Sequence, residues 1–534
     1  MTPLTKILFL GMDAGDKHLI HKWSADGHLP VLNSLLAKGM VGDTVNIEGF
    51  FVGSTWPSFY TGTTPVHHGF NNLVRLKPDS YEFHRCDSDE LTEREPFWNY
   101  LSQAGCKVAV LDIPLSPLPK YLHGMHLVEW GSHDAVYGFH SWPPELKGEV
   151  LSSFGPHPWS ESCDTIGKTA EEICNFRDRL VQGVQRKTQL TLKYLKQGGW
   201  NFFGQVFTES QCVGHQCWHL HDKGHPGFDP ETVAVAGNPI LDIYKAIDTA
   251  LGEILEEINQ DTMVIFLASH GMSHMVGAQF LLPEILFRLQ AAVPHPEIDR
   301  INKWDSFLAN SWKSIPAPLK EKLLPLKNLV RRYLSTEPDH SSAIFFSRIN
   351  PCKSKCFIVP NSLPITGLRI NLIGREPDGI ITPGREFNNF CDELAKDLLQ
   401  IRDSATGIPI IKKITRTTDL YQGEFPDHLP DLLVYWNEDM YIGTNAIKNT
   451  QGSTLRVSSP KIKIVEGTNM YCRTGDHRPE GLMITVGPGI KSCKLTTPVS
   501  IMDFAPTFAG LLGVSIPDTD GTAIPEILKA AGMT

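Results

Sequence analysis

The stretch GSTWPSFYTGTTPVHHGF, residues 53–70, brings several hydroxyl groups, a Trp-Pro pair and a His-His-Gly triplet close together. A Ser or Thr hydroxyl is a poor nucleophile unless a neighbouring base or a metal activates it. The same residue types also begin helices, and Thr55 could cap a helix entered by Trp56-Pro57, because proline is favoured in the first turn. Two hypotheses for Thr55 therefore stay open: a catalytic nucleophile or a helix cap.

Three apolar runs elsewhere in the chain each end in polar residues that could carry chemistry. Asp13 follows ILFLGM, Glu209 follows FFGQVFT, and Ser269-His270 follows MVIFLA. In open parallel sheets, ligands bind at the carboxyl ends of the strands. We therefore expect these residues, far apart in the sequence, to meet along one edge of a sheet.

The elements that would position them alternate along the chain. Short apolar runs (KILFLGMD, KVAVLDIP, NFFGQVF, DTMVIFLASHGM) are separated by amphipathic stretches such as LPVLNSLLAKGM. Strands that alternate with helices predict an α/β fold, with a mostly parallel sheet covered by helices on both faces.

The alternation of strand and helix patterns stops between residues 278 and 365, where prolines and the basic stretch KNLVRRYL occur. We interpret this range as an inserted cap or lid. Strand patterns resume in GLRINLIGREPDGI, PDLLVYW and GLMITVGPGI, and the chain closes with a helix pattern in SIMDFAPTFAGLLG. The predicted organisation is a core in two parts, residues 1–277 and 366–534, with the cap at 278–365 between them.

Composition narrows the class of protein. Of the 534 residues, 41% are hydrophobic and 20% are charged, as in globular proteins, and no apolar run approaches the roughly 18–20 residues of a membrane span. The net charge of −10 argues against a broad nucleic-acid-binding surface. The apolar run before Asp13 is too short for a secretory signal, and the eleven cysteines form no CxxC pair, so we expect reduced thiols and a cytoplasmic location.

Several motifs, in this order, resemble the alkaline phosphatase superfamily, specifically its type I phosphodiesterase and nucleotide pyrophosphatase-like branch. They are the strand ending at Asp13, then LPVLNSLLAKGM, TGTTPVHHG, GHQCWHLHDKGHPGFD, ASHGM, TGDHRPEG with GPGI, and MDFAPTFAGLLG. The resemblance covers most of the chain outside the insert. It implies a three-layer α/β/α sandwich and a pair of divalent metals, usually zinc, held by Asp and His beside a Thr or Ser nucleophile.

The resemblance assigns roles to three of the candidate residues. Asp13 matches the metal ligand after the first strand, and His477 matches a metal-binding histidine in a loop ahead of a strand. His270 matches the histidine of the family's Asp-His-Gly, but Ser269 stands where the family has the Asp. One anionic ligand is therefore missing.

A fourth ligand, His215, matches a family histidine that follows its partner Asp by four residues. The residue four positions before His215 is Gln211, which supplies no charge. Glu209 lies two residues further back, and we favour its carboxylate as the replacement, with Gln211 as the alternative.

The predicted nucleophile also departs from the family pattern. The family's nucleophile lies nine positions before the Thr of its Thr-Gly pair, here Thr61-Gly62, and that position is Val52. Thr55 is three residues later, a shift of about 4.5 Å along a helix. Thr55 therefore acts as the nucleophile only if the preceding loop is remodelled, and an activated water is the alternative.

The changed positions fall unequally on the two implied metal sites. Glu209, His215 and His477 would form a two-histidine, one-carboxylate set, which is common in catalytic zinc sites. The other site keeps Asp13 and His270. We expect one or two divalent metals per chain, zinc or alternatively manganese, with tighter binding at the first site.

These observations predict a metal-dependent hydrolase of small-molecule phosphoesters, with diesters or nucleotide pyrophosphate-type bonds favoured by the branch resembled. Two alternatives stay open. One is a family member that has lost hydrolysis and acts as a binding or regulatory protein, and the other is a group transferase that uses the same site. The sequence does not determine the oligomeric state.

Overall fold

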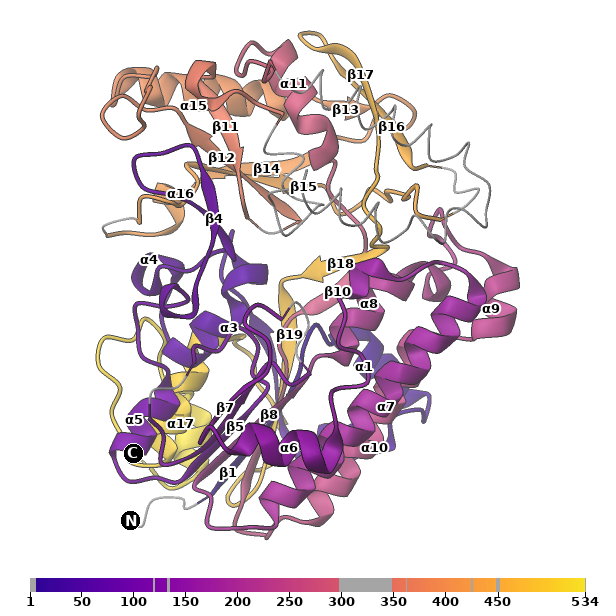
Figure 1. Cartoon of the computed structure of the whole chain (residues 1–534), viewed down its shortest axis with the longest axis vertical. Coiled ribbons are helices and arrows are strands. Elements are labelled where there is room, and N and C mark those ends of the chain that lie inside the picture. The colour runs from indigo at the N-terminus through magenta and orange to yellow at the C-terminus, as the bar shows by residue number, and fades with distance from the viewer. Residues whose placement is uncertain are drawn as a thin grey trace.

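The computed structural model describes residues 6–118, 121–131, 135–296, 348–361, 363–423, 426–447 and 452–533. Most of the expected cap, 278–365, lies outside the described residues, because 297–347 are not among them. The described chain forms a main lobe around a large sheet and a smaller second lobe above it (Figure 1).

The main sheet has ten strands and is mostly parallel around its centre. Strands β9, β1, β8, β5 and β6 run parallel to one another, whereas β19 is antiparallel to both β9 and β2, and β7 is antiparallel to β6. The strands, in spatial order, are β20 (Cys493–Lys494), β2 (Met40–Val45), β19 (Glu480–Val486), β9 (Met263–Ala268), β1 (Ile7–Met12), β8 (Phe202–Phe207), β5 (Val108–Leu111), β6 (Gly124–Val128) and β7 (His140–Trp142), with β21 (Val499–Ser500) paired to β2.

Both faces of this sheet are buried. Along β1, Leu8 and Leu10 pack into one apolar cluster and Ile7 and Phe9 into the other, as the alternation of side chains along a strand requires. Helices on the first face are α1 (Lys17–Ala25), α2 (Pro30–Lys38), α6 (Leu146–Phe154), α7 (Ala170–Leu195), α8 (Glu209–His221), α9 (Pro230–Ala236) and α10 (Pro239–Glu256). Helices on the second face are α3 (Phe51–Thr61), α4 (Pro65–His68), α5 (Phe97–Gln103), α17 (Phe504–Leu511) and α18 (Pro525–Ala530). The predicted three-layer α/β/α fold is confirmed (Figure 1).

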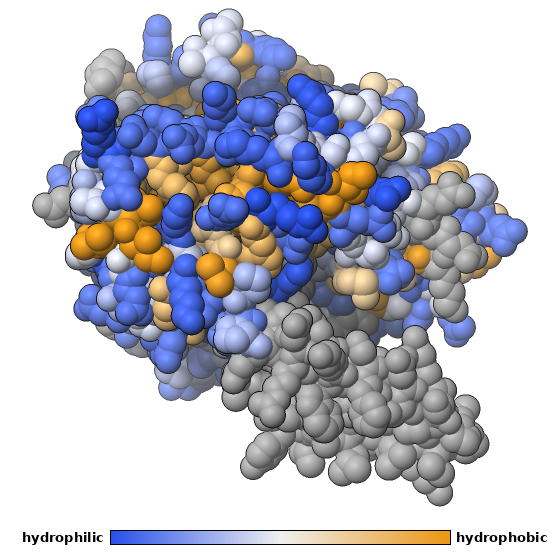
Figure 2. Space-filling view, turned by 90° about the horizontal axis from the view of Figure 1, so that it is seen from above, coloured by the Kyte–Doolittle hydropathy of each residue, from blue (hydrophilic) through white to orange (hydrophobic). Residues whose placement is uncertain are grey.

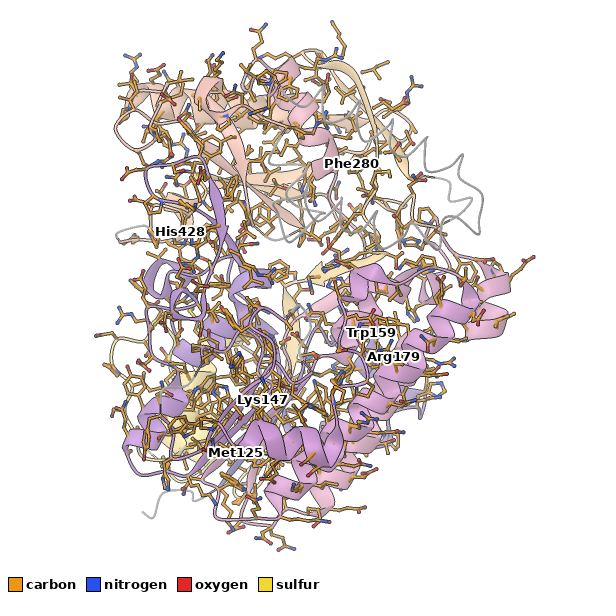
Figure 3. All side chains as sticks on the ribbon, in the orientation of Figure 1. Met125, Lys147, Trp159, Arg179, Phe280 and His428 are labelled. Atoms are coloured by element: carbon orange, nitrogen blue, oxygen red, sulfur yellow. The ribbon has the colours of Figure 1, made fainter. Side chains whose placement is uncertain are left out.

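The second lobe has its own apolar core. Phe280 belongs to this core, and Figure 3 shows it in the upper part of the molecule, far from Met125 in the main sheet. The lobe contains an antiparallel sheet of β11 (Cys356–Val359), β12 (Ile365–Ile370), β15 (Leu432–Trp436) and β14 (Ile411–Arg416), a second sheet of β13 (Arg402–Asp403), β16 (Thr454–Ser459) and β17 (Lys463–Thr468), and helices α11 (Leu282–Arg288), α15 (Arg385–Leu398) and α16 (Thr417–Leu420).

The expected domain boundary at residue 366 falls inside β12, and here the structure differs from the sequence-based division. The patterns GLRINLIGREPDGI and PDLLVYW belong to strands of the second lobe rather than to the main sheet. The chain returns to the main lobe only at β18 (Gly475–Arg478) and β19. Apolar strand runs look alike in either sheet, because periodicity reports burial and not the partner strand.

Viewed from above, hydrophilic side chains surround a band of apolar ones on the second lobe (Figure 2). Ile373, Ile380 and Leu399 are exposed apolar residues of this lobe. Among the helices of the described residues, none is both long enough and apolar enough to cross a membrane.

Candidate active site

The strand register brings the expected residues to one edge of the main sheet. Met12, the last residue of β1, pairs with Phe207 of β8 on one side and with Ala268 of β9 on the other. The next residues, Asp13 and Ser269, are therefore neighbours, and both side chains are buried. The predicted meeting of these strand ends is found.

A hydrogen-bonded chain of four side chains runs along this edge. The Ser269 hydroxyl donates to Asp13 Oδ1 (3.0 Å), so it accepts from His270 Nδ1 (2.9 Å). His270 Nε2 is then an acceptor, and it receives the hydrogen bond of His477 Nδ1 (2.8 Å). Every proton in this chain points toward the Asp13 carboxylate.

Two further contacts hold Asp13. The Trp56 indole N–H donates to Asp13 Oδ1 (2.9 Å), and the Ser210 hydroxyl donates to the Asp13 carbonyl (2.5 Å). Burial lowers the pKa of His270 despite the opposing effect of the nearby Asp13 charge, so neutral imidazole is favoured. Neutral imidazole is the form that binds a metal or accepts a proton.

A short β-ribbon positions His477. Strand β10 (Gly271–His274) pairs antiparallel with β18, and Met272 lies opposite His477 in this register. Since β10 directly follows His270, one ribbon carries both histidines. The sequence placed His477 in a loop ahead of a strand, whereas it lies within a short strand of its own.

His215 projects from α8 toward the same ribbon. Its Nδ1 donates to the Gly475 carbonyl (3.0 Å), and its ring centre lies 4.6 Å from that of His477. Its Nε2 accepts from Arg473 Nη1 (3.1 Å). Arg473 in turn forms a two-point ion pair with Asp164, through Nε (2.7 Å) and Nη2 (2.9 Å).

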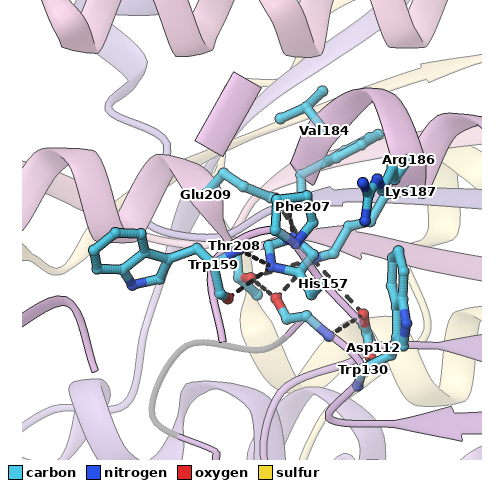
Figure 4. A network of polar contacts seen from close by, with 12 residues as sticks. Asp112, Trp130, His157, Trp159, Val184, Arg186, Lys187, Phe207, Thr208 and Glu209 are labelled. Atoms are coloured by element: carbon cyan, nitrogen blue, oxygen red, sulfur yellow. Dashed lines mark hydrogen bonds and ion pairs between the residues drawn. The ribbon is translucent and has the colours of Figure 1, made fainter. Parts of the chain in front are cut away.

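Glu209 has different partners from those expected. Its Oε1 is 3.0 Å from His157 Nε2 and its Oε2 is 3.5 Å from Lys187 Nζ, all of them buried (Figure 4). Lys187 also lies 3.8 Å from Asp112. Burial alone would raise the pKa of Glu209, but the Lys187 charge and the His157 hydrogen bond outweigh it and hold the pKa below the ordinary value. The expected grouping of Glu209 with His215 and His477 is not found.

The segment that carries His157 is fixed against α7. Arg179 donates from Nε to the Pro158 carbonyl (2.8 Å) and its guanidinium lies over the Trp159 ring, 4.5 Å from the ring centre. Figure 3 shows Trp159 and Arg179 side by side at that helix. The Glu209 network is therefore part of the packing of α7 on the sheet. His157 and Lys187 had no motif that marked them in the sequence.

Thr55 lies inside α3, and the helix-cap interpretation is wrong. The helix begins at Phe51, with Phe50 as the N-cap, so Pro57 is within it. The buried Thr55 hydroxyl is hydrogen-bonded to the Phe51 carbonyl and lies 2.7 Å from Asn46 Oδ1. Asn46 Nδ2 donates to the Ser269 carbonyl (2.9 Å). Asn46 therefore connects Thr55 to the hydrogen-bonded side chains that end at Asp13.

The side chains present do not fit the pair of metals that the resemblance implies. Ser269 has no charge to offer, and the Glu209 carboxylate is engaged with Lys187 and His157. His270 Nε2 and His477 Nδ1 are 2.8 Å apart and share a proton. Two nitrogens bound to one tetrahedral zinc lie about 3.3 Å apart. A single cation could therefore replace this proton if the distance between the two nitrogens increased slightly. Among the described residues, the group of three ligand-type side chains that already converge is elsewhere, at His84, Cys86 and Glu90.

Arg473 and Asp164 are the site residues that sequence reasoning missed. Arg478, the residue after His477, donates to the backbone carbonyls of His477 (2.9 Å) and His274 (3.1 Å). Arg473 lies only four residues before His477 in YCRTGDHRPEG, so its position in the motif was a signal. No pattern in the sequence connects Asp164 to this loop.

Comparison with known proteins identifies the family. The sequence profile of the type I phosphodiesterase / nucleotide pyrophosphatase family matches residues 7–459. The chain belongs to this family. The predicted resemblance is confirmed, and the chain is a member of a family of phosphoester hydrolases that depend on divalent metals.

The first of the following solved structures supports the fold, and the other two show weaker similarity. The alkaline phosphatase PafA is 12% identical with a TM-score of 0.51, over 98% of this chain and 99% of that one. The murine ectonucleotide pyrophosphatase / phosphodiesterase 5, as an inactive variant with AMP, is 11% identical with a TM-score of 0.47, over 97% of each chain. The phosphonoacetate hydrolase from Sinorhizobium meliloti is 12% identical with a TM-score of 0.48, over 95% of each. No curated protein matches the sequence significantly.

Proposed function

We propose that this protein hydrolyses a small-molecule phosphoester at the edge formed by β1 and β9, where His270 and His477 would hold one divalent metal and Asp13, beyond Ser269, would supply the compensating negative charge. The observation that carries the proposal is the continuous chain from His477 through His270 and Ser269 to Asp13. The two imidazole nitrogens are ligands that zinc accepts, and manganese is the alternative. Membership of the family favours diesters or nucleotide pyrophosphate-type bonds over monoesters.

When bound, the metal supplies a positive charge that polarises the phosphoryl oxygens and favours deprotonation of the attacking group. The chain's own residues orient this site. Ser269 fixes the tautomer of His270 by accepting from Nδ1, and Trp56 holds the Asp13 carboxylate in place. Outer contacts of this kind set the orientation and basicity of metal ligands.

The contacts of Thr55 favour water as the nucleophile. For Thr55 to attack, its proton must leave, and the groups within hydrogen-bond reach are the Phe51 carbonyl and Asn46 Oδ1. Neither a peptide carbonyl nor an amide oxygen is a base at neutral pH. Thr55 therefore holds Asn46 in place, and water is the attacking group in the proposed reaction.

The test combines metal analysis with hydrolysis of two probes, bis(p-nitrophenyl) phosphate as the diester and p-nitrophenyl phosphate as the monoester. We expect one zinc per chain, its loss in His270→Ala and in His477→Ala, and faster turnover of the diester in the zinc-loaded protein. A preparation that binds neither zinc nor manganese, or that binds metal but hydrolyses neither probe, would contradict the proposal.

A second candidate function is binding or regulation without hydrolysis. It is supported by the replaced positions Val52, Gln211 and Ser269, and by the engagement of Glu209 with Lys187. Tight binding of phosphate or a nucleotide without turnover would favour it.

We also propose a reducing, cytoplasmic location, supported by eleven cysteines that are all free thiols among the described residues.

A further inference from the structure

One side of the site carries an arginine at the position where a second metal would bind. His215 presents Nε2 as its acceptor, because Nδ1 donates to the Gly475 carbonyl. The Nε2 lone pair is the one a metal would use, and it accepts from Arg473 Nη1 at 3.1 Å. A metal ion on this nitrogen would have to displace the guanidinium.

The guanidinium is held in place and buried. Asp164 binds it at two points, 2.7 and 2.9 Å away, and Arg473 is only 8% exposed. A two-point pair of this kind fixes the plane of the guanidinium as well as its position. Arg473 is therefore a buried side chain held in a fixed orientation at the site, and not a mobile surface side chain.

The neighbouring charges match a guanidinium and not a metal. Gln211 offers no carboxylate, and the nearby Glu209 carboxylate is bound by Lys187 and His157. The Asp164 carboxylate on this side of the site is bound at two points by Arg473, so a divalent ion beside His215 would have to displace the guanidinium from Asp164 as well. The pairing with Asp164 balances the single charge of Arg473.

Arg473 brings hydrogen-bond donors rather than net positive charge to this edge, because Asp164 balances its single charge. A guanidinium has five N–H donors in a plane, and in Arg473 Nε and Nη2 each donate one to Asp164 and Nη1 donates one to His215. Guanidinium N–H groups are also donors to phosphoryl oxygens. His215 links Arg473 to His477, whose ring centre is 4.6 Å from that of His215.

We infer that Arg473, clamped by Asp164 and hydrogen-bonded to His215, replaces the second metal of the site and binds the phosphoryl oxygens of the substrate. This inference rests on the proposed function only for the identity of the substrate. It makes the protein a hydrolase with one metal and one arginine, in which His215 positions the guanidinium and is not a metal ligand.

The first experiment is metal analysis of the full chain and of His215→Ala. We expect no more than one zinc per chain after loading with excess zinc, and the same content in His215→Ala. Two zinc ions per chain, one of which is lost in His215→Ala, would overturn the inference, because the guanidinium would then have given way to a metal.

The second experiment is calorimetric titration with inorganic phosphate, which requires no turnover. We expect at least a tenfold weaker affinity in Arg473→Gln combined with Asp164→Asn, a pair that leaves no unpaired carboxylate behind. Arg473→Lys should retain part of the affinity. The control is Arg456→Gln combined with Glu466→Gln, which likewise removes both charges of an ion pair, but of an exposed pair in the second lobe. It should leave phosphate affinity unchanged.

The outcomes separate the two proposals. Phosphate binding that depends on Arg473, in a protein that hydrolyses neither probe, supports the inference and contradicts the proposed function. Hydrolysis with a phosphate affinity that the Arg473 variants do not change contradicts the inference and leaves the proposed function standing. A far-ultraviolet circular dichroism spectrum like that of the wild type shows that each variant is folded.

Discussion

At the scale of single residues, the hydrogen-bond partners of each polar group distinguish groups that could take part in the reaction from groups that stabilise the fold. Asp13, Ser269, His270 and His477 form one directed chain at the strand ends. Glu209 is just as buried, yet its carboxylate compensates Lys187. Residue type and strand-end position are the same in both cases, and only the partners differ.

Thr55 gives the first residue-scale prediction. Thr55→Val keeps the shape of the side chain and removes the hydroxyl, so we expect kcat to fall by about tenfold or less if water is the nucleophile, and by about a thousandfold or more if Thr55 attacks. The matched control is Thr61→Val on the same helix, where the hydroxyl makes a similar bond to the carbonyl four residues back, Pro57 (2.7 Å). Steady-state kinetics with the diester probe measures both.

Glu209 gives the second residue-scale prediction. Glu209→Gln keeps the hydrogen-bonding shape but leaves Lys187 with Asp112 as its remaining ion-pair partner, at 3.8 Å. Removing one member of a buried pair costs about 3 kcal/mol of unfolding free energy, which urea denaturation measures. Zinc content should stay at the wild-type value. An unchanged stability with a lost zinc ion would instead restore Glu209 as a ligand.

At the scale of elements, the contact between α8 and β18 decides whether the two sides of the site meet. Gly475 lies so close to α8 that an added Cβ would be 2.2 Å from the Gly214 carbonyl oxygen. The same glycine accepts the hydrogen bond of His215 Nδ1. A side chain here would push the ribbon with His477 away from the helix with His215.

We therefore expect Gly475→Ala to lower both stability and activity, with a stability loss of about 2 kcal/mol or more from the steric strain. The control is Gly148→Ala, in α6, where an added Cβ meets nothing within 4 Å. Alanine should stabilise that helix by about 0.5–1 kcal/mol. Urea denaturation and turnover of the diester probe distinguish the two, and equal effects would contradict the steric argument.

A buried histidine on β6 predicts the sensitivity of the fold to acid. Burial lowers the pKa of His126 to about 3, and neither ring nitrogen has a hydrogen-bond partner among the described residues. The unfolded chain takes up a proton near pH 6.5 whereas the folded chain does not, so stability falls as the pH drops from about 6.5 toward 3.

His126→Leu removes that proton uptake. Between pH 7 and pH 5 we expect the variant to lose about 2 kcal/mol less unfolding free energy than the wild type, because 1.5 pH units at about 1.4 kcal/mol each no longer contribute. Urea denaturation at the two pH values measures the difference. Identical losses would show that His126 is protonated in the folded protein.

At the scale of the whole molecule, the second lobe shares part of its packing with the main lobe. Leu433 of β15, with Ile365 and Leu429, belongs to the same apolar cluster as Phe59 of α3. Across the same contact, Lys413 pairs with Glu48 (2.7 Å), and the Tyr421 hydroxyl donates to the Glu48 carbonyl (2.6 Å). The lobes are therefore joined by apolar and polar contacts together.

We expect Leu433→Ala, at the shared cluster, to destabilise the lobes together, by about 2–5 kcal/mol. Hydrogen exchange would then increase in α3 as well as in β12. The control is Leu394→Ala, inside the second lobe's own core, which should increase exchange mainly in that lobe. Exchange confined to the second lobe in both variants would contradict a shared unfolding unit.

The sequence by itself determined the three-layer fold, the strand-end positions of Asp13, Ser269 and His270, and the family. Periodicity and local motifs involve residues that are close together in the sequence, so they can be recognised without knowing the contacts of distant residues. Only the tertiary structure decided that β12 and β15 join a separate sheet, that Glu209 pairs with Lys187, and that Arg473 reaches His215. Each of these depends on which of several chemically suitable partners is nearest in space, and that is set by the packing of segments far apart in the chain.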